Sequence, residues 1–503
     1  MKSENKVTVV AAVAYTVGDI VGSGIFVSPS VILSHSGSVG VSLLVWGFSA
    51  VIASFGALCY IELGTSIRRS GCDFAYLSHA GWNPLASAFL FVSCSLTYPS
   101  ILAVQTITFG EYIVNGFHKF IHVSPNWEPI LKRLIGFSVL LPLMGVNFLS
   151  LRRVAARFQI VATAAKLLVI CVIVITGFYH LIFKGETQNF DSKTIFDGTT
   201  KESGDIVLAL YAGLFAYNGW DILNFGTEEI ENPRRTLPLA AFLGILISAI
   251  TYLSMNIAYF SVLTIDEFRN SETVAVTFAE RTLGSFHYAV PFLIGVMLLG
   301  NLNSTIFGSS RYLFAGGVAA VMPKAVGCVH EESGSPRAAI LVEVLICVGV
   351  SFIGDLDSLI SYMTFAMWMQ RTMTQIAFIW MRYSGKLPLK PTENIFRIPL
   401  AVPFIFLFLC LMLLIVPVWQ HFKVGIYGCS LAIVGLVTYF LFIYPSNLPA
   451  FLHKINDSTL KFAQILLNIQ PEKDVEKEEK REENERKITK ITKIENEEKI
   501  TKF

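Results

Sequence analysis

The sequence has little charge for its length. Only 15% of its 503 residues are Asp, Glu, Lys or Arg, whereas soluble domains carry about 25%. Hydrophobic residues make up 53% of the chain, and the mean hydropathy is +0.58. The chain is therefore expected to be an integral membrane protein. Its net charge of +2 gives no indication of a nucleic-acid partner.

The sequence also lacks the short motifs of common enzymes. It contains no phosphate-cradling loop, no HExxH and no GxSxG, so neither enzyme activity nor a cofactor is expected. No pair among the eight cysteines has metal-ligand spacing, and none falls in a connection expected outside the cell. Neither a metal site nor a disulfide framework is predicted. No small-residue cleavage pattern follows the first residues, and no removable signal peptide is expected.

Long apolar runs are abundant, and a run of about 20 residues can cross a bilayer as a helix. Twelve spans are predicted, at 8–34, 41–66, 84–116, 131–149, 157–183, 204–231, 237–263, 288–317, 336–354, 357–383, 398–420 and 424–444. Basic residues gather in alternate connections, at 68–69, 152–157, 234–235 and 382–397. The positive-inside rule then places both termini in the cytoplasm. The expected fold class is an all-α membrane protein of about twelve transmembrane helices.

The composition changes after residue 444. Residues 450–468 carry apolar side chains at helical spacing between polar ones, which predicts a helix along the inner membrane surface. From Pro471 onward the chain is dominated by mixed charge, as in a solvated single helix or a disordered segment. Residues 445–503 are therefore expected to form a cytoplasmic tail.

The first span is interrupted at its centre by Gly22-Ser23-Gly24. Glycine is unfavourable inside a helix, and backbone can leave the helix at membrane depth only beside protein or a water-filled cavity. A break here would direct free N–H groups, at the positive end of the second half-helix, toward a small anion such as a carboxylate. The alternative is that the glycines only let neighbouring helices approach closely.

The sixth span, 204–231, is interrupted in the same way. Its centre, at 215–221, reads FAYNGWD and brings Asn, Gly and Asp into an apolar run. Paired interruptions at corresponding positions of two halves are typical of a transporter site at the bilayer midplane. The order of the spans then predicts the following division: an N-terminal tail at 1–7, five-helix repeats at 8–183 and 204–383, helices 11 and 12 at 398–444, and the tail at 445–503.

Three stretches resemble the L-type amino acid transporter light chains of the amino acid–polyamine–organocation superfamily. They are VGSGIFVSP at 21–29, FAYNGWDILNFGTEEIENPRRTLPLA at 215–240, and NSTIFGSSRYLF at 303–314 followed by Pro323. The resemblance runs from about residue 8 to 445. It implies the 5+5 inverted repeat of the leucine transporter with broken helices 1 and 6, amino acid exchange and alternating access.

The resemblance also implies roles for residues at the two breaks. The substrate carboxylate would meet the backbone N–H groups of Ser23, Gly24 and Ile25, and the ammonium would meet carbonyls of Ile20, Phe215 and Asn218. Phe215 matches an aromatic gate that closes over bound substrate, although ordinary packing is the alternative.

Lys166 lies within an apolar span, where a charge is costly and usually functional. The alternative is that its side chain extends to the cytoplasmic interface. Relatives carry a Lys at this place where sodium-coupled transporters bind an ion. The resemblance therefore implies an ammonium tied to the first helix and transport that does not need sodium.

Two acids bear on substrate choice. Asp221 stands where members that accept cationic amino acids carry an acid, and Asp19 replaces a usually neutral residue. Together they would attract cationic side chains or share a proton. Arg371 puts a cation in the tenth span, which packs near the first in this fold, so an Asp19–Arg371 pair is possible and would leave Asp221 for substrate.

The expected function is sodium-independent exchange of neutral and possibly cationic L-amino acids at the plasma membrane. The alternatives are an exchanger of large neutral amino acids only and a transport-inactive amino acid sensor. Light chains join a heavy chain through a Cys after the third span, but the connection FHKFIHVSPNWEP has none. A disulfide-linked heavy chain is therefore not expected.

Overall fold

The computed structural model describes residues 7–69, 71–117, 127–149, 156–271, 273–352, 356–387, 396–420, 422–445 and 449–471. Two predicted features lie largely outside these residues. They are the connection after the third span and the charged tail beyond residue 471.

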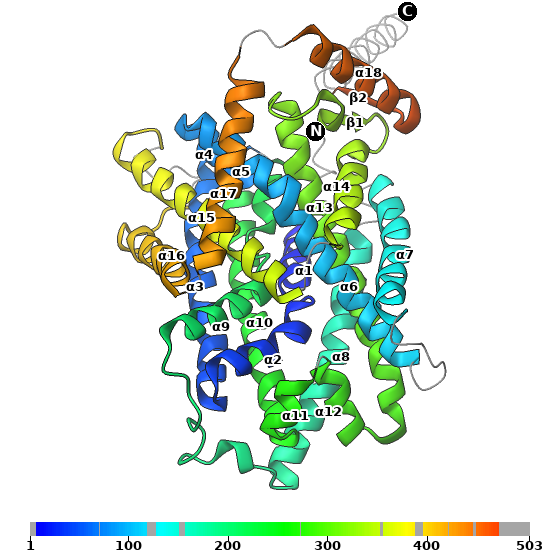
Figure 1. Cartoon of the computed structure of the whole chain (residues 1–503), viewed down its shortest axis with the longest axis vertical. Helices are drawn as coiled ribbons and strands as arrows, with labels where there is room; N and C mark the ends of the chain where they lie inside the picture. The colour runs from blue at the N-terminus through cyan, green and yellow to red at the C-terminus, as the bar shows by residue number, and fades with distance from the viewer. Residues whose placement is uncertain are drawn as a thin grey trace, which may run out of the picture.

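The described chain is almost entirely helical, and each predicted span coincides with a helix or a helix pair (Figure 1). The helices are α1 (Val9–Ile20) with α2 (Gly24–Ser36), α3 (Val39–Ser66), α5 (Asn83–Val92) with α6 (Tyr98–Phe117), α7 (Glu128–Phe148), α8 (Ala156–Phe183), α9 (Ser203–Ala216), α10 (Pro233–Val262), α13 (Val290–Val318), α14 (Arg337–Val350), α15 (Leu356–Tyr383), α16 (Ala401–Gln420) and α17 (Phe422–Thr438). Within the described residues, six helices are long and apolar enough to cross a membrane alone, and the bent pair α1–α2 makes seven. The prediction of an all-α membrane protein is confirmed.

Both predicted interruptions are real breaks. α1 ends at Ile20, and α2 starts at Gly24 after a bend of 40°. α9 ends at Ala216, and the chain then turns into the short 3-10 segment η5 (Ile222–Glu229). Gly219 makes this turn with φ +107°, and a side chain there would collide with Asp19. The turn therefore requires glycine for both conformation and space.

The two broken spans lie side by side in the centre of the molecule. α2 packs along α9, and α1 packs between α10 and α8 (Figure 1). The approach of α2 to α9 depends on Gly24, because a Cβ atom there would lie 2.4 Å from Cα of Ala216. Ser28 Oγ also donates a 2.8 Å hydrogen bond from α2 to the carbonyl of Ala212 on α9. The breaks consequently border one shared space.

Short elements close the two ends of the bundle. α4 (Cys72–Ala80), α18 (Ala450–Leu467) and the strands β1 (Cys328–His330) and β2 (Ile469–Pro471) lie at one end, and α11 (Ile265–Asn270) and α12 (Val274–Thr282) lie at the other (Figure 1). α4, which follows the basic connection at 68–69, thus lies at the opposite end from α11 and α12. Cys72 and Cys328, which lie between predicted spans, start α4 and β1 and are buried.

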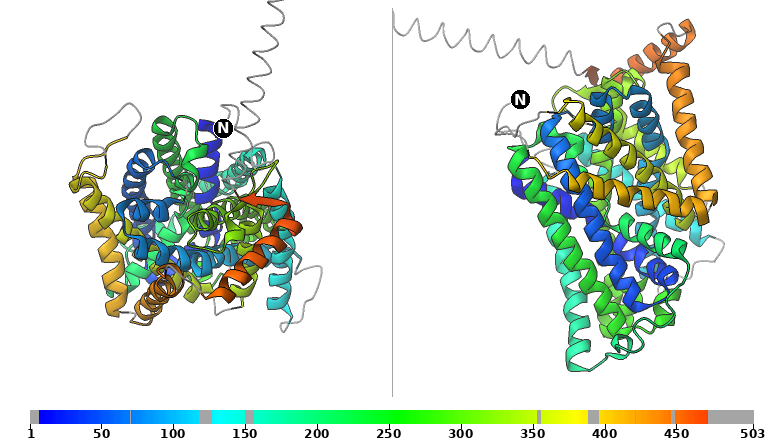
Figure 2. Two further views of the ribbon diagram at one scale, coloured as in Figure 1. Left: turned by 90° about the horizontal axis from the view of Figure 1, so that it is seen from above. Right: turned by 90° about the vertical axis from the view of Figure 1, so that its left-hand side faces the viewer.

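The C-terminal helix α18 lies across its end of the bundle (Figure 2). β2 follows it and pairs with β1 in antiparallel register, with Gln470 opposite Val329. Several large apolar side chains of α18, including Phe462 and Ile465, are exposed. The amphipathic helix is as predicted at 450–468, whereas its position along a membrane surface stays a prediction.

Candidate functional site

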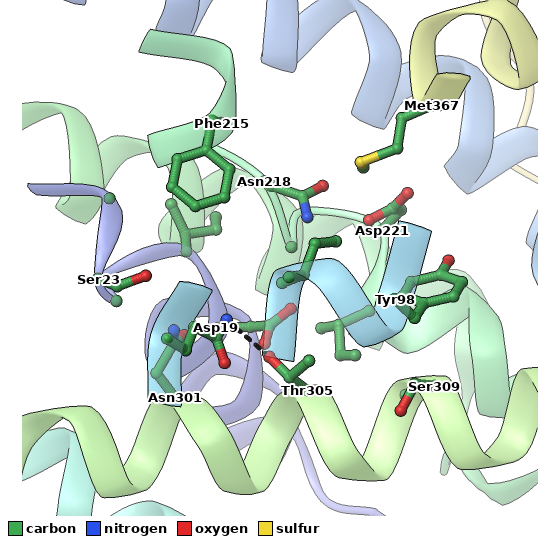
Figure 3. Close-up of a pocket in the computed structure, with 18 of the residues that line it drawn as sticks. Asp19, Ser23, Tyr98, Phe215, Asn218, Asp221, Asn301, Thr305, Ser309 and Met367 are labelled. Atoms are coloured by element: carbon green, nitrogen blue, oxygen red, sulfur yellow. Dashed lines mark hydrogen bonds between the residues drawn. The ribbon is translucent and has the colours of Figure 1, made fainter. Parts of the chain in front are cut away.

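A cavity lies between the two helix breaks (Figure 3). α6, α13 and α15 complete its wall. Of the residues singled out in the sequence, the following line it: Asp19, Ile20, Ser23, Gly24, Phe215, Asn218, Asp221 and Arg371. The structure therefore gathers most of the predicted site residues around one space.

The N-terminus of α2 presents unpaired backbone donors to this cavity. Ser23 is the N-cap, and its carbonyl accepts hydrogen bonds from the N–H groups of Phe26 and Val27. Among the described residues, the N–H groups of Ser23, Gly24 and Ile25 have no backbone acceptor. Free N–H groups at the positive end of a helix form a site for an anion such as a carboxylate.

The C-terminus of α1 is held by a buried ammonium. Lys166 on α8 is 1% exposed, and its Nζ donates to the carbonyl oxygens of Gly18, at 2.8 Å, and Val21. These carbonyls have no partner within the helix because α1 ends here. The positive charge therefore lies at the negative end of the half-helix dipole, where it is favourable.

Tyr252 of α10 joins the two breaks. Its hydroxyl lies 2.5 Å from the carbonyl oxygen of Ile20 and 2.8 Å from that of Ala216, and it can donate to either. Sequence reasoning missed this residue, because a tyrosine in an apolar span is ordinarily a packing residue. The one hydroxyl thus couples the positions at which α1 and α9 end.

Two of the carbonyls assigned to a substrate ammonium already accept hydrogen bonds. Ile20 accepts from Tyr252, and Phe215 accepts from the N–H groups of Asn218, at 3.1 Å, and Tyr217. A carbonyl oxygen has two lone pairs, so that of Ile20 can still bind a second donor. The Phe215 ring borders the cavity (Figure 3). Phe215 also belongs to a small apolar cluster with Ile101 and Met363.

The possible pair between Asp19 and Arg371 does not form. Arg371 Nη2 instead lies 2.9 Å from Asp221 Oδ2 and 2.9 Å from Asn218 Oδ1. The turn after α9 brings the acceptor groups of Asn218 and Asp221 to α15. Asp19 lies elsewhere, against Gly219 of the same turn and against Ser304 of α13. Asp221 is therefore the neutralised acid, contrary to the expectation.

Asp19 faces the cavity with a neutral partner. Its Oδ1 accepts a 2.6 Å hydrogen bond from Ser304 Oγ on α13. Among the described residues no basic nitrogen forms an ion pair with it. Of the two acids that line the cavity, Asp221 is paired with Arg371, whereas Asp19 has no cationic partner among the described residues.

The cavity wall also contains amides that sequence reasoning missed. Gln105 Nε2 donates to Thr305 Oγ1 at 2.9 Å (Figure 3), while Gln105 Oε1 and Asn301 Oδ1 are buried without a partner in the described structure. An amide in the middle of an apolar span is a detectable signal, because it is costly in lipid. Among the described residues, no group of three His, Cys, Asp or Glu side chains is placed to hold a metal ion.

The profile of the family described as "Amino acid permease" matches residues 7–452. The chain belongs to this family. It is 42% identical to amino acid transporter protein 6 of Caenorhabditis elegans, over 93% of this chain and 89% of that protein. It is also 35% identical to the human cystine/glutamate transporter, over 94% and 92% of the two chains, and 33% identical to the mouse b(0,+)-type amino acid transporter 1, over 94% and 95%. These relatives assign the permease to the L-type light chains of the amino acid–polyamine–organocation superfamily, a group of transporters.

Proposed function

We propose that this permease is a sodium-independent exchanger of L-amino acids that works by alternating access. The observation that carries the proposal is the pairing of unlike groups across one cavity: unpaired N–H groups at Ser23 and Gly24, and carbonyl oxygens with the Asp19 carboxylate beside them. A zwitterionic amino acid offers the complement of both. The three relatives named above, which are amino acid transporters by name, support this substrate class.

In this proposal the substrate carboxylate binds the N–H groups of Ser23, Gly24 and Ile25. The ammonium binds carbonyl oxygens of Ile20, Phe215 and Asn218, with Asp19 supplying negative charge nearby. Phe215 closes over the bound substrate. Substrate binding would then draw α2 and the turn after α9 together, which links occupancy to the alternating motion.

Sodium independence rests on Lys166, whose ammonium holds the carbonyls of Gly18 and Val21. We expect Lys166→Met to lose most leucine uptake, about tenfold or more, because these oxygens would be left without a donor. Uptake of radiolabelled leucine in sodium-free and sodium-containing medium measures this loss and also the sodium dependence of the unmodified chain. Lys193→Met, at an exposed lysine, is the matched control. Sodium-dependent uptake by the unmodified chain would refute this role for Lys166.

The remaining assignments follow the same reasoning. The chain divides into five-helix repeats at 8–183 and 204–383, both termini face the cytoplasm of a plasma-membrane protein, and no disulfide links the chain to a heavy chain. Surface biotinylation of the chain expressed alone, with antibody tags at each terminus, tests the location, the orientation and the absence of the disulfide. Tag binding in intact cells, or a higher-mass band that disappears on reduction, would count against them.

Exchange is tested by counterflow with the purified protein in liposomes. Preloading with unlabelled leucine should accelerate entry of labelled leucine several-fold over empty liposomes. A transport-inactive sensor is the second candidate, because the Arg371–Asp221 pair fastens the turn after α9 to α15. A sensor would bind leucine, seen as a rise in Tm, but would give no counterflow.

A further inference from the structure

The side chain of Arg371 occupies a complete site for a guanidinium group. Its Nη2 contacts the carboxylate of Asp221 and the amide oxygen of Asn218, both at 2.9 Å. Its Cζ lies 4.7 Å from the ring centroid of Trp220 and 5.3 Å from that of Trp368. A carboxylate, an amide oxygen and two aromatic rings are the groups that recognise arginine in any binding site.

This guanidinium site forms one end of the cavity. Asn218, Asp221 and Arg371 line it at that end, whereas the unpaired N–H groups belong to Ser23 and its neighbours. Figure 3 shows Ser23 and Asp221 at opposite sides of the cavity. A substrate whose carboxylate lies at Ser23 would therefore extend its side chain toward Asp221.

We propose that Arg371 is a tethered occupant of the side-chain end of the cavity, and that it excludes cationic amino acids from this transporter. The inference rests on the proposed function, which it deepens by naming the substrate class. With Arg371 in place, Asp221 is neutralised, and an arginine or lysine side chain would bring a second cation against the first. The unmodified chain consequently carries neutral amino acids.

Burial makes this exclusion strong. The side chains of Arg371 and Asp221 are 5% and 8% exposed, so water screens their charges little. An incoming cation would have to displace a residue whose effective concentration is high because it is part of the chain. A neutral side chain meets no such competition, because it needs no contact with Asp221.

The experiment compares uptake of labelled leucine, arginine and glutamate by three surface-delivered chains. They are the unmodified chain, Arg371→Gln and the double variant Arg371→Gln/Asp221→Asn. Arginine uptake should rise about tenfold in Arg371→Gln, equivalent to about 1.4 kcal/mol. It should fall again in the double variant, which removes the carboxylate but keeps a neutral pair. Leucine uptake by each chain is the reference against which its arginine and glutamate uptake is expressed.

Arg371→Gln leaves Asp221 buried without its partner and can impair folding. If it does not reach the surface, Arg371→Lys gives the same readout, because an ammonium lacks the planar fork and holds the site less well. Free guanidinium ion should inhibit arginine uptake by the variant, since it refills the vacated site. Arg69→Gln, at an exposed arginine, controls for loss of charge.

Three results would overturn the inference. The first is arginine uptake by the unmodified chain equal to that of Arg371→Gln. The second is leucine uptake without any gain of arginine uptake in every folded Arg371 variant. The third is glutamate uptake that is lost in Arg371→Gln, which would make Arg371 a ligand for an acidic substrate. If no chain transports any of the three amino acids, the proposed function fails instead, so the two failures are distinguishable.

Discussion

Two ion pairs with the same length occupy different regions of the molecule. In the centre of the bundle, Arg371 and Asp221 lie 2.9 Å apart with side chains 5% and 8% exposed. At the end covered by α18, Lys324 and Asp457 also lie 2.9 Å apart, but their side chains are 54% and 53% exposed. Distance alone therefore says little about what an ion pair contributes.

The two ion pairs differ in what solvates one charged group when the other is removed. Water solvates an exposed charge at once, and salt screens it, so an exposed pair contributes little. A buried charge that loses its partner has no substitute, and the cost is several kcal/mol. Buried pairs can therefore determine specificity and conformation, while exposed pairs add only modestly to contacts that other groups make.

The largest effect is expected at a second buried pair, Glu62 with Arg382. Arg382 donates to both carboxylate oxygens of Glu62, through Nε at 2.8 Å and through Nη2, and Glu62 also accepts from the N–H of Ile398. The contacts join α3, α15 and the chain entering α16. Glu62→Gln should lower the free energy of unfolding by about 3–5 kcal/mol, because Arg382 stays buried and uncompensated. Thermal denaturation of the purified protein measures the loss as a lower Tm.

The matched control for this change is Glu280→Gln, which alters an exposed acid in the same way. A double variant, Glu62→Gln/Arg382→Gln, should cost less than the sum of its single changes, because it leaves no lone charge. Equal Tm values for Glu62→Gln and Glu280→Gln would contradict the distinction between buried and exposed pairs.

A smaller effect is expected where the buried contact is a neutral hydrogen bond. Tyr252→Phe removes the hydroxyl that serves the carbonyls of Ile20 and Ala216. The expected cost is about 1–3 kcal/mol, because the breaks lose a buried donor. Leucine uptake should fall several-fold, and Tm should fall with it.

Tyr259 provides a control on the same helix. It is also fully buried, but its hydroxyl has no partner among the described residues. Tyr259→Phe should therefore leave Tm unchanged or raise it, since it removes an unsatisfied polar group. If both variants lowered Tm equally, the bridge between the breaks would not be the cause.

The helix breaks could be predicted because their causes are local. Each break interrupts an apolar run of the sequence. The first span is interrupted by Gly22 and Gly24, and the sixth by Gly219 with its polar neighbours. The cost of charge in lipid likewise singled out Lys166. The position of the cavity between the two breaks followed from these same local features.

The partners of charged side chains could not be predicted in the same way. Whether Arg371 meets Asp19 or Asp221 depends on the turn after α9 and on the packing of α15, and no spacing along the chain encodes that choice. Tyr252 was missed because its role comes from two backbone carbonyls that exist only where helices end. The strands β1 and β2 are three residues each and pair across about 140 residues of chain, too short and too distant for a pattern.

The smallest effect is expected at Lys324 and Asp457. The hydrogen bond from the Lys324 ammonium, helped by its charge, holds the pKa of Asp457 below its usual value. A pKa lowered by folding means that the contact contributes above the usual Asp pKa, about 3.9, and is lost as pH falls through the lower folded value. Asp457→Asn at neutral pH should therefore remove the contribution of this contact, as acidification below about pH 4 does in the unmodified chain.

α18 should nevertheless stay in place in Asp457→Asn. β1 pairs with β2, and Arg337 Nη1 donates to the carbonyl of Leu467 at 3.0 Å, so other contacts hold the helix. Spin labels on α18 and α14 should report the same distance in Asp457→Asn, in the unmodified chain and in Asp266→Asn, a control at the opposite end. A longer distance in Asp457→Asn alone would mean that an exposed pair anchors α18, and exposure would then be a poor guide to what an ion pair contributes here.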